Sequence, residues 1–428
     1  MTQQGFNRYT LSQWLLPLLP ASLIVSKRLN VLLIGLYGLS VLIQPAFWSR
    51  FREMIQKPWI WAFLSFYLWH ALSMGWSDNI DMALFALEKK ASLLLIPCLI
   101  ALDKKIDFVG FQQCMLSLVL SCCFFIWICL FLALSNYLDS GEARFFFYHA
   151  FSWPLDELNA IYFSFYTFTG LAFGHYLAKS KYSLLSSYRW QGFVFFSLSM
   201  GLILLSSRLF IVLTLLFLLR LAVLNYAQIV SRKIRIGGLI IVGLFMAAVL
   251  FFSQIRDRFD QLLDSNFTVL QQDQFKYDTS FNGLTIRLLF WRFAGEIVTE
   301  QRAYLFGTGI GDAQDAMNET IIKHNVYHGN PQLGDQGYLG YNFHNQFVET
   351  WVQLGFIGLI LWLLLLRQGI SLRALDWSHP YLYLMLAILA FSMIESLLER
   401  QHGIVFFALF VSIFQTTLKY EVPQKPFT

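Results

Sequence analysis

The sequence predicts an all-α polytopic membrane protein with about twelve transmembrane helices. Apolar residues make up 57% of the 428 positions, and twelve spans of roughly 20 residues would use almost all of them. Charged residues are 13% of the chain, about half of their usual share in soluble domains. The 43 Phe, 19 Tyr and 13 Trp residues suit lipid contact and interfacial aromatic belts. This composition excludes a soluble enzyme, a disordered chain and a secreted disulfide scaffold.

Apolar runs separated by polar breaks give the order of the spans. Pro17 and Pro20 predict a kink in the first. The seventh and eighth form one run interrupted by Ser206, Ser207 and Arg208. That run is too long for one helix across a core of about 30 Å, so it predicts two helices, although totals of eleven or thirteen spans stay open. The twelve spans lie near 11–26, 30–47, 58–75, 84–102, 110–136, 157–178, 191–206, 209–226, 235–254, 346–366, 381–397 and 402–418.

Lysine and arginine predict the orientation of these spans. With a cytoplasmic N-terminus, most basic loop residues fall inside and few fall in the short outer loops, as the positive-inside rule requires. The net charge of +5 then reflects topology, and we expect no nucleic-acid partner. The expected parts are nine spans in 1–254, a large, partly helical periplasmic loop in 255–343, three spans in 344–418 and a cytoplasmic tail in 419–428.

The sharpest motif is Phe343-His344-Asn345-Gln346-Phe347-Val348-Glu349, where the long loop ends and the tenth span begins. His344 would lie at the outer aqueous side, a depth that suits a lipid-linked substrate and a polar acceptor. Because imidazole titrates near neutral pH, a histidine there can act as a general base. The alternative is a structural histidine that anchors the span. Gly355 and Gly358 follow in the span, and two glycines allow close helix approach.

Three arginines are candidates for binding an anion. Arg208 lies at the hinge of two apolar helices, where a charge is costly unless it is paired or faces water. Its guanidinium suits bidentate phosphate binding, and an arginine that reaches lipid headgroups is the alternative. Arg287 and Arg292 lie five residues apart, so on a helix they would point about 140° apart. We expect one, with Arg287 favoured, to face a cavity; an amphipathic interfacial helix is the alternative.

Other signals are weaker. The run Gly307-Thr308-Gly309-Ile310-Gly311-Asp312 resembles a phosphate-cradling loop but lacks the P-loop lysine and a preceding strand, so a flexible turn is the alternative. Two charged clusters at the outer ends of spans are expected to border the same cavity, unless they are solvated. They are Glu395, Glu399, Arg400 and His402, and Glu88, Lys89 and Lys90.

The sequence also lacks the patterns that hold metal ions. It has no Asp-x-Asp pair and no His, Cys or carboxylate group at metal-ligand spacing. We therefore expect no metal cofactor, and expect arginines to neutralise a leaving phosphate.

The chain resembles one known superfamily. His344-Asn345, nine residues and then Gly355-Phe356-Ile357-Gly358 resemble the His-Asn-x9-Gly-x-x-Gly signature of the O-antigen ligase and polymerase superfamily. Ser207-Arg208 before an apolar helix, and Arg287 in its Arg-x-x-x-Trp setting, are similar to the arginines of that superfamily. The resemblance covers most of the architecture but few individual residues.

The resemblance implies a GT-C-type membrane glycosyltransferase of the bacterial inner membrane, active at the periplasmic face. An O-antigen ligase would move a glycan from an undecaprenyl-diphosphate carrier to the lipid A core, without a metal and with inversion. We expect His344, Arg208 and Arg287 as catalytic residues. The residues expected to bind substrate are Asn345, Arg292, Glu395 and Arg400.

Three alternatives are kept open. A polysaccharide polymerase or a protein O-oligosaccharyltransferase of the same superfamily would use the same donor chemistry on another acceptor. A transporter would use the charged residues as a substrate path, but transporters place such charges near the midplane and show internal repeats. Neither feature is evident in the sequence, so a ligase is the leading hypothesis.

Overall fold

The computed structural model describes residues 11–155, 158–180, 183–224, 243, 247, 253–263, 267–277, 279–330, 332, 334–369 and 379–417. Their regular elements are all helices, and the described residues contain one isolated bridge, Asn330 to Asp335, and no strand. The predicted ninth span, near 235–254, lies almost entirely outside these residues, and the predicted tail, 419–428, lies outside them completely.

The first half of the chain forms helices that follow the apolar runs. They are α1 (Leu11–Leu15), α2 (Leu18–Val25), α3 (Lys27–Leu42), α4 (Phe47–Ile55), α5 (Pro58–Ser73), η1 (Met74–Trp76), α6 (Ile80–Lys90), α7 (Ser92–Leu102), α8 (Phe108–Ser140), η2 (Ala143–Phe146), α9 (Tyr148–Ser152), η3 (Trp153–Leu155), α10 (Ala160–Lys179), η4 (Ser183–Leu185), α11 (Tyr188–Leu205) and α12 (Arg208–Leu224).

The second half contains the long polar segment and the last helices. They are α14 (Ser253–Leu263), η5 (Phe267–Gln271), α15 (Thr285–Glu300), α16 (Ala313–Lys323), α17 (Gln346–Gly369), α18 (Pro380–Ser392), η8 (Leu397–Glu399) and α19 (Gln401–Thr417).

Several predicted spans are broken helices. The first divides into α1 and α2 next to Pro17, and the fourth divides into α6 and α7 at Ala91. The break between α11 and α12 falls at Ser206, whose φ of 49° ends the first helix in the left-handed region. Helix α4, which the apolar pattern does not predict, meets α3 at 111°.

Three of the described helices, α8, α11 and α17, are long and apolar enough to cross a membrane. The bent pair α3 and α4 adds one more if it counts as a broken span, and α18 and α19 are shorter apolar helices. The described residues thus support a multi-pass membrane protein. The number twelve and the GT-C architecture stay predictions.

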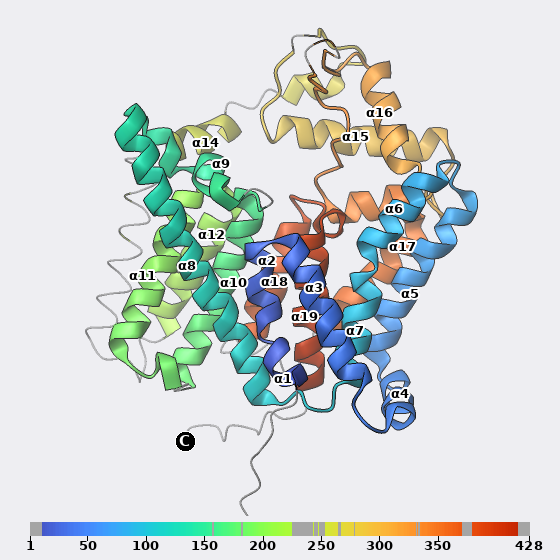
Figure 1. The fold of residues 1–428 in the computed structure, drawn as a ribbon. Coiled ribbons are helices and arrows are strands. Elements are labelled where there is room, and N and C mark those ends of the chain that lie inside the picture. Colours follow the sequence, from blue (N-terminus) through green and yellow to red (C-terminus); the bar gives the residue numbers. More distant parts are fainter. Residues whose placement is uncertain are drawn as a thin grey trace, which may run out of the picture.

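The polar segment forms a small folded unit at one end of the bundle. Figure 1 shows α15 and α16 beyond the end where α6 and α9 lie, whereas α1 and α4 lie at the opposite end. Buried residues of α15 and α16, among them Phe293 and Met317, form a separate core that also includes Phe343 and Val352 beside and within α17. The segment is therefore tied by apolar packing to the helix that begins after His344.

Helix α17 is broken at Gly355, where φ is 66° and ψ is −166°. The amides of Phe356 and Ile357 donate to the carbonyls of Tyr304 and Leu305 at 2.8 and 3.2 Å. A Cβ added to Gly355 would lie 2.2 Å from the carbonyl carbon of Leu305. The first glycine of the signature thus lets another stretch of backbone enter the helix, a closer approach than helix-to-helix packing requires.

The glycine-rich run at 307–312 directly follows the segment that docks there and packs against the turn of α17 before the break. The amides of Thr308 and Gly309 donate to the carbonyls of Val352 and Gln353, and the Asp312 carboxylate accepts from two backbone amides of the turn before α6. Five of the six amides in the run, all except that of Ile310, are therefore already bonded to protein. The sequence suggests a phosphate cradle or a flexible turn for this run. The structure shows instead an ordered loop that is packed against α17 and bonded to the turn before α6.

Candidate functional site

The site begins at the N-terminus of α17. Asn345 caps the helix, because its Oδ1 accepts from the amides of Phe347 and Val348 at 2.9 and 3.2 Å. Its Nδ2 donates to the carbonyl of Met393 at 3.2 Å, so the cap also holds the segment that follows α18. His344, directly before the cap, has a φ of 48° in the left-handed region. The chain therefore turns sharply at the histidine, a conformation that costs about 1–3 kcal/mol and persists only where surrounding contacts impose it.

Glu395 joins His344 to Arg287. Oε2 of the carboxylate lies 3.1 Å from Nδ1 of His344, and Oε1 accepts from Nη2 of Arg287 at 2.9 Å. The side chain of Glu395 is 9% exposed, whereas those of Arg287 and His344 are 19% and 20% exposed. A carboxylate at Nδ1 favours the tautomer that carries its proton there, so Nε2 is left with a lone pair. No other residue of the described chain forms a hydrogen bond with Nε2.

One face of α15 is directed to this histidine. The Trp291 indole donates to the carbonyl of Phe343 at 2.9 Å, and the rings of Phe290 and His344 are stacked with centroids 6.4 Å apart. Residues 287, 290 and 291 are one helix turn apart and so share a face. Arg287 is fixed further by the carbonyls of Ile394 and Gly283, at 3.1 and 2.6 Å.

Arg208 lies beside Arg287. A Cβ built on Gly283 would be 3.4 Å from Nη1 of Arg287 and 3.6 Å from Nη2 of Arg208. Both guanidinium groups are thus close to the same point, although 79 positions of sequence separate the two residues. The structure therefore brings Arg208, Arg287, Glu395, His344 and Asn345 together.

Arg258 is a further member of this group that the sequence analysis missed. Nη1 of Arg208 donates to its carbonyl at 2.6 Å, and its guanidinium carbon lies 3.3 Å from the centroid of the Tyr148 ring. In the sequence, Arg256-Asp257-Arg258 looks like an ordinary solvated run of alternating charges. Only the packing of α14 against the start of α9 distinguishes Arg258 from its neighbours.

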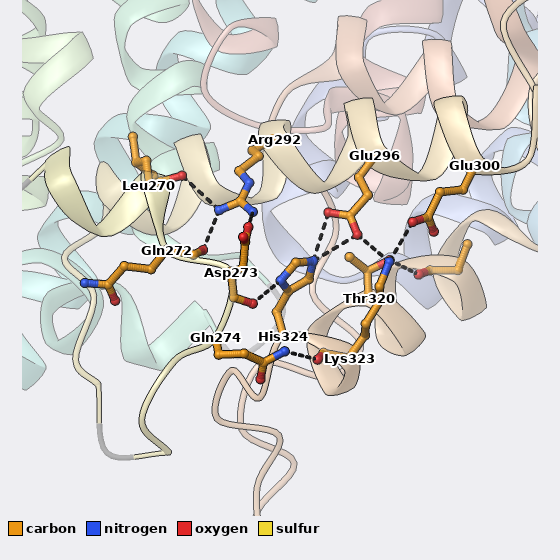
Figure 2. Close-up of polar contacts among 11 residues, drawn as sticks. Leu270, Gln272, Asp273, Gln274, Arg292, Glu296, Glu300, Thr320, Lys323 and His324 are labelled. Carbon is orange, nitrogen blue, oxygen red and sulfur yellow. Dashed lines mark hydrogen bonds and ion pairs between the residues drawn. The ribbon is translucent and has the colours of Figure 1, made fainter.

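Arg292 lies on another side of α15 and does not contact this group. Figure 2 shows its guanidinium between the carbonyls of Leu270 and Gln272 and the Asp273 carboxylate. The three contacts measure 2.9, 2.6 and 2.7 Å. Arg292 thus holds residues 270–273 against α15. This position favours Arg287, and not Arg292, as the arginine of the site.

The face of α15 that carries Arg292 also carries a second polar network (Figure 2). Glu296 contacts Nε2 of His324 at 2.8 Å and Nζ of Lys323 at 2.7 Å, and Lys323 also contacts Glu300 at 2.6 Å. Burial alone would raise the pKa of Glu296, but the bonds from Lys323 and His324 outweigh it and lower that pKa. Glu296 and Glu300 raise the pKa of Lys323. The network joins α15 to the end of α16.

The other predicted charges form a separate cluster. Glu399 pairs with Lys89 at 2.9 Å and with Lys90 at 2.6 Å, and Lys90 is 1% exposed. Arg400 is exposed, and its side chain forms no hydrogen bond or ion pair among the described residues. His402 is buried. The expected ion-pair network therefore exists at Glu399 and the two lysines, and Arg400 is not part of it.

Glu349 holds the two segments of the site together. Its Oε2 accepts from the amide of Phe343 at 3.1 Å and from the hydroxyl of Ser396 at 2.9 Å. These residues directly adjoin His344 and Glu395. The position of Glu349 in the first turn of α17 therefore fixes the histidine relative to its carboxylate.

The arrangement can accept a proton at His344 and bind an anion at the arginines. Among the described residues, no group of three or more His, Cys, Asp or Glu side chains is placed to hold a metal ion.

Comparison with known protein families identifies a related family. Residues 193–363, which run from α11 into α17, match the family model described as O-antigen ligase. No curated protein matches the chain. The matched segment includes four of the five residues that the structure brings together, and Glu395 lies beyond it.

Proposed function

We propose that this chain is an O-antigen ligase. Its match over residues 193–363 identifies it as a member of the O-antigen ligase superfamily. It would transfer a glycan from undecaprenyl diphosphate to the lipid A core at the periplasmic face of the bacterial inner membrane. The observation that carries the proposal is the pairing of a base-and-carboxylate unit, His344 with Glu395, and two adjacent arginines at one end of the bundle.

In this proposal Arg208 and Arg287 bind the diphosphate of the donor. Guanidinium groups suit phosphate oxygens because their donors are planar and permanently charged. As the bond between the sugar C1 and the phosphate oxygen breaks, the electron pair stays on that oxygen. The two arginines stabilise the charge that develops there.

His344 would act on the acceptor. Nε2 accepts the proton of the acceptor hydroxyl while its oxygen attacks C1 from the face opposite the phosphate, so the anomeric configuration inverts. Glu395 holds the imidazole in the tautomer with a free Nε2 and stabilises the imidazolium that forms. No step of this scheme calls for a metal ion.

The Lys and Arg asymmetry supports a periplasmic position for this end of the bundle. The proposal keeps the predicted division into spans 1–254, loop 255–343, spans 344–418 and tail 419–428. The position of α15 and α16 beyond one end of the bundle supports its large loop (Figure 1). The twelve spans and the GT-C architecture are part of the proposal.

The test compares purified variants and a deletion strain. His344→Ala should abolish transfer and leave carrier binding unchanged, whereas Arg208→Ala should weaken both. In a host that lacks the protein, glycolipid gels should lose long-chain lipopolysaccharide while carrier-linked polymer accumulates. A single capped repeat would instead indicate a polymerase, and normal transfer by His344→Ala would show that the mechanism is wrong.

A further inference from the structure

Arg208, Arg258 and Arg287 form a group of three guanidinium residues, here called the arginine cluster. The charges of Arg258 and Arg287 both act on the guanidinium of Arg208. Arg287 is paired with Glu395, but neither Arg208 nor Arg258 contacts a carboxylate within the described parts of the chain. Half-buried positive charges that lie close together repel one another unless a bound anion neutralises them.

Arg258 is held by an aromatic ring and not by an acid. Its guanidinium lies 3.3 Å from the ring centroid of Tyr148, well within the range of a cation–π contact. Tyr148 has a φ of 56°, in the left-handed region, where a bulky side chain is unusual. Nε of Arg258 is buried and has no hydrogen-bond partner in the described structure, so the group still has a donor to satisfy.

The charge of the cluster matches a diphosphate. Three guanidinium groups and the ionised Glu395 leave two net positive charges. A diphosphate that links a lipid to a sugar carries two negative charges, one on each phosphate. A single phosphate would be satisfied by Arg208 and Arg287, which leaves Arg258 for the second.

We propose that Arg258, held on the Tyr148 ring, is a third arm of the anion site and makes it select a polyprenyl diphosphate over a polyprenyl monophosphate. This inference rests on the proposed function, since it concerns the donor of that reaction. Arg258 adds a contact to the second phosphate, and Tyr148 keeps its planar group facing the cluster without neutralising its charge.

The test measures binding to the purified full-length chain in neutral-lipid nanodiscs. The ligands are a short polyprenyl diphosphate that carries a sugar, the matching polyprenyl monophosphate with the same sugar, inorganic diphosphate and an anionic phospholipid. Arg258→Ala should raise the Kd for polyprenyl diphosphate roughly 10- to 100-fold, and change the Kd for the monophosphate less than about 3-fold. Arg258→Lys should fall between, and Tyr148→Leu should weaken diphosphate binding more than Tyr148→Phe.

Arg256→Ala is the matched control, because it removes an arginine with a 55% exposed side chain from the same helix. An equal loss in Arg256→Ala, or an unchanged diphosphate Kd in folded Arg258→Ala, would overturn the inference. If Arg258→Ala does not fold, Arg258→Lys provides the test. An unchanged ratio of the diphosphate and monophosphate Kd values in that variant would overturn the inference. If the wild-type chain prefers the phospholipid to both polyprenyl ligands, the proposed donor itself is wrong. If the wild-type chain binds the diphosphate tightly and Arg258→Ala leaves the ratio of the diphosphate and monophosphate Kd values unchanged, only the proposed role of Arg258 is wrong.

Discussion

The carboxylate of Glu395 bridges His344 and Arg287, at 3.1 Å from Nδ1 of the imidazole and 2.9 Å from Nη2 of the guanidinium. One acidic group thus serves both halves of the proposed chemistry. It orients the base through one oxygen and holds an arginine of the anion site through the other. This relationship leads to the first of four predictions.

Glu395→Gln should separate these two roles. The amide keeps the shape of the side chain but does not stabilise an imidazolium, so kcat should fall roughly 10²- to 10⁴-fold. Arg287 loses its counter-charge, so the KM for the donor should stay level or fall. Steady-state transfer by the purified protein measures both values. Glu142→Gln, an exposed carboxylate beside Arg144, is the control, and an unchanged kcat in Glu395→Gln would exclude the orienting role.

Arg287→Ala and Arg292→Ala should differ, although both residues lie in α15. Arg287→Ala should reduce transfer by about 10²-fold or more, because a donor to the developing phosphate charge is lost. Arg292→Ala should lower the stability of the α15–α16 unit by about 1 kcal/mol through lost contacts to residues 270–273, with transfer changed only a few-fold. Transfer rates and thermal unfolding in detergent measure the two effects. The reverse pattern would assign the site to Arg292.

Gly355→Ala should disrupt the docking of residues 304–309 into α17. The added carbon would meet the backbone of Leu305 at 2.2 Å, at a φ of 66° that L side chains rarely adopt. We expect a loss of more than about 2 kcal/mol in the free energy of unfolding, together with loss of transfer. Gly35→Ala in α3 has open space around its Cβ and serves as the control. Thermal unfolding that is equal for the two variants would contradict the account of the break.

The α15–α16 network should weaken in acid. Because the pKa of Glu296 is lowered in the fold, its contribution to stability is complete above its ordinary value of 4.5. That contribution is lost as the pH falls through the lower, folded value. The protection factors of the α15 and α16 amides, which correct each exchange rate for its intrinsic pH dependence, should therefore stay level from pH 7 to about 5 and then fall. Glu296→Gln should show faster exchange at pH 7 and a flatter pH dependence, and a wild-type profile in that variant would exclude Glu296 as the cause.

Some of the site could be predicted before any coordinates. The break before Arg208 follows from the length of the apolar run. Asn345, which the sequence predicts to bind substrate, instead caps α17 in the structure. The sequence favours Arg287 over Arg292 only through the resemblance, because their positions on a helix do not decide between them. The sequence predicts that Glu395 binds substrate, but it does not predict the contact of Glu395 with Nδ1 of His344.

Local properties of the chain therefore determined its class: a helical membrane protein whose helices break at prolines and serines, and whose long polar segment ends in a His-Asn pair. Long-range packing decided the rest. Arg287 meets Glu395 across 108 positions, and Arg208 meets Arg258 across 50. No local pattern encodes such contacts, because they depend on how α14 and α15 pack against residues 394–395 and the start of α12. Only that packing places Arg287 and Arg258 in the site and inserts residues 304–305 at the break in α17.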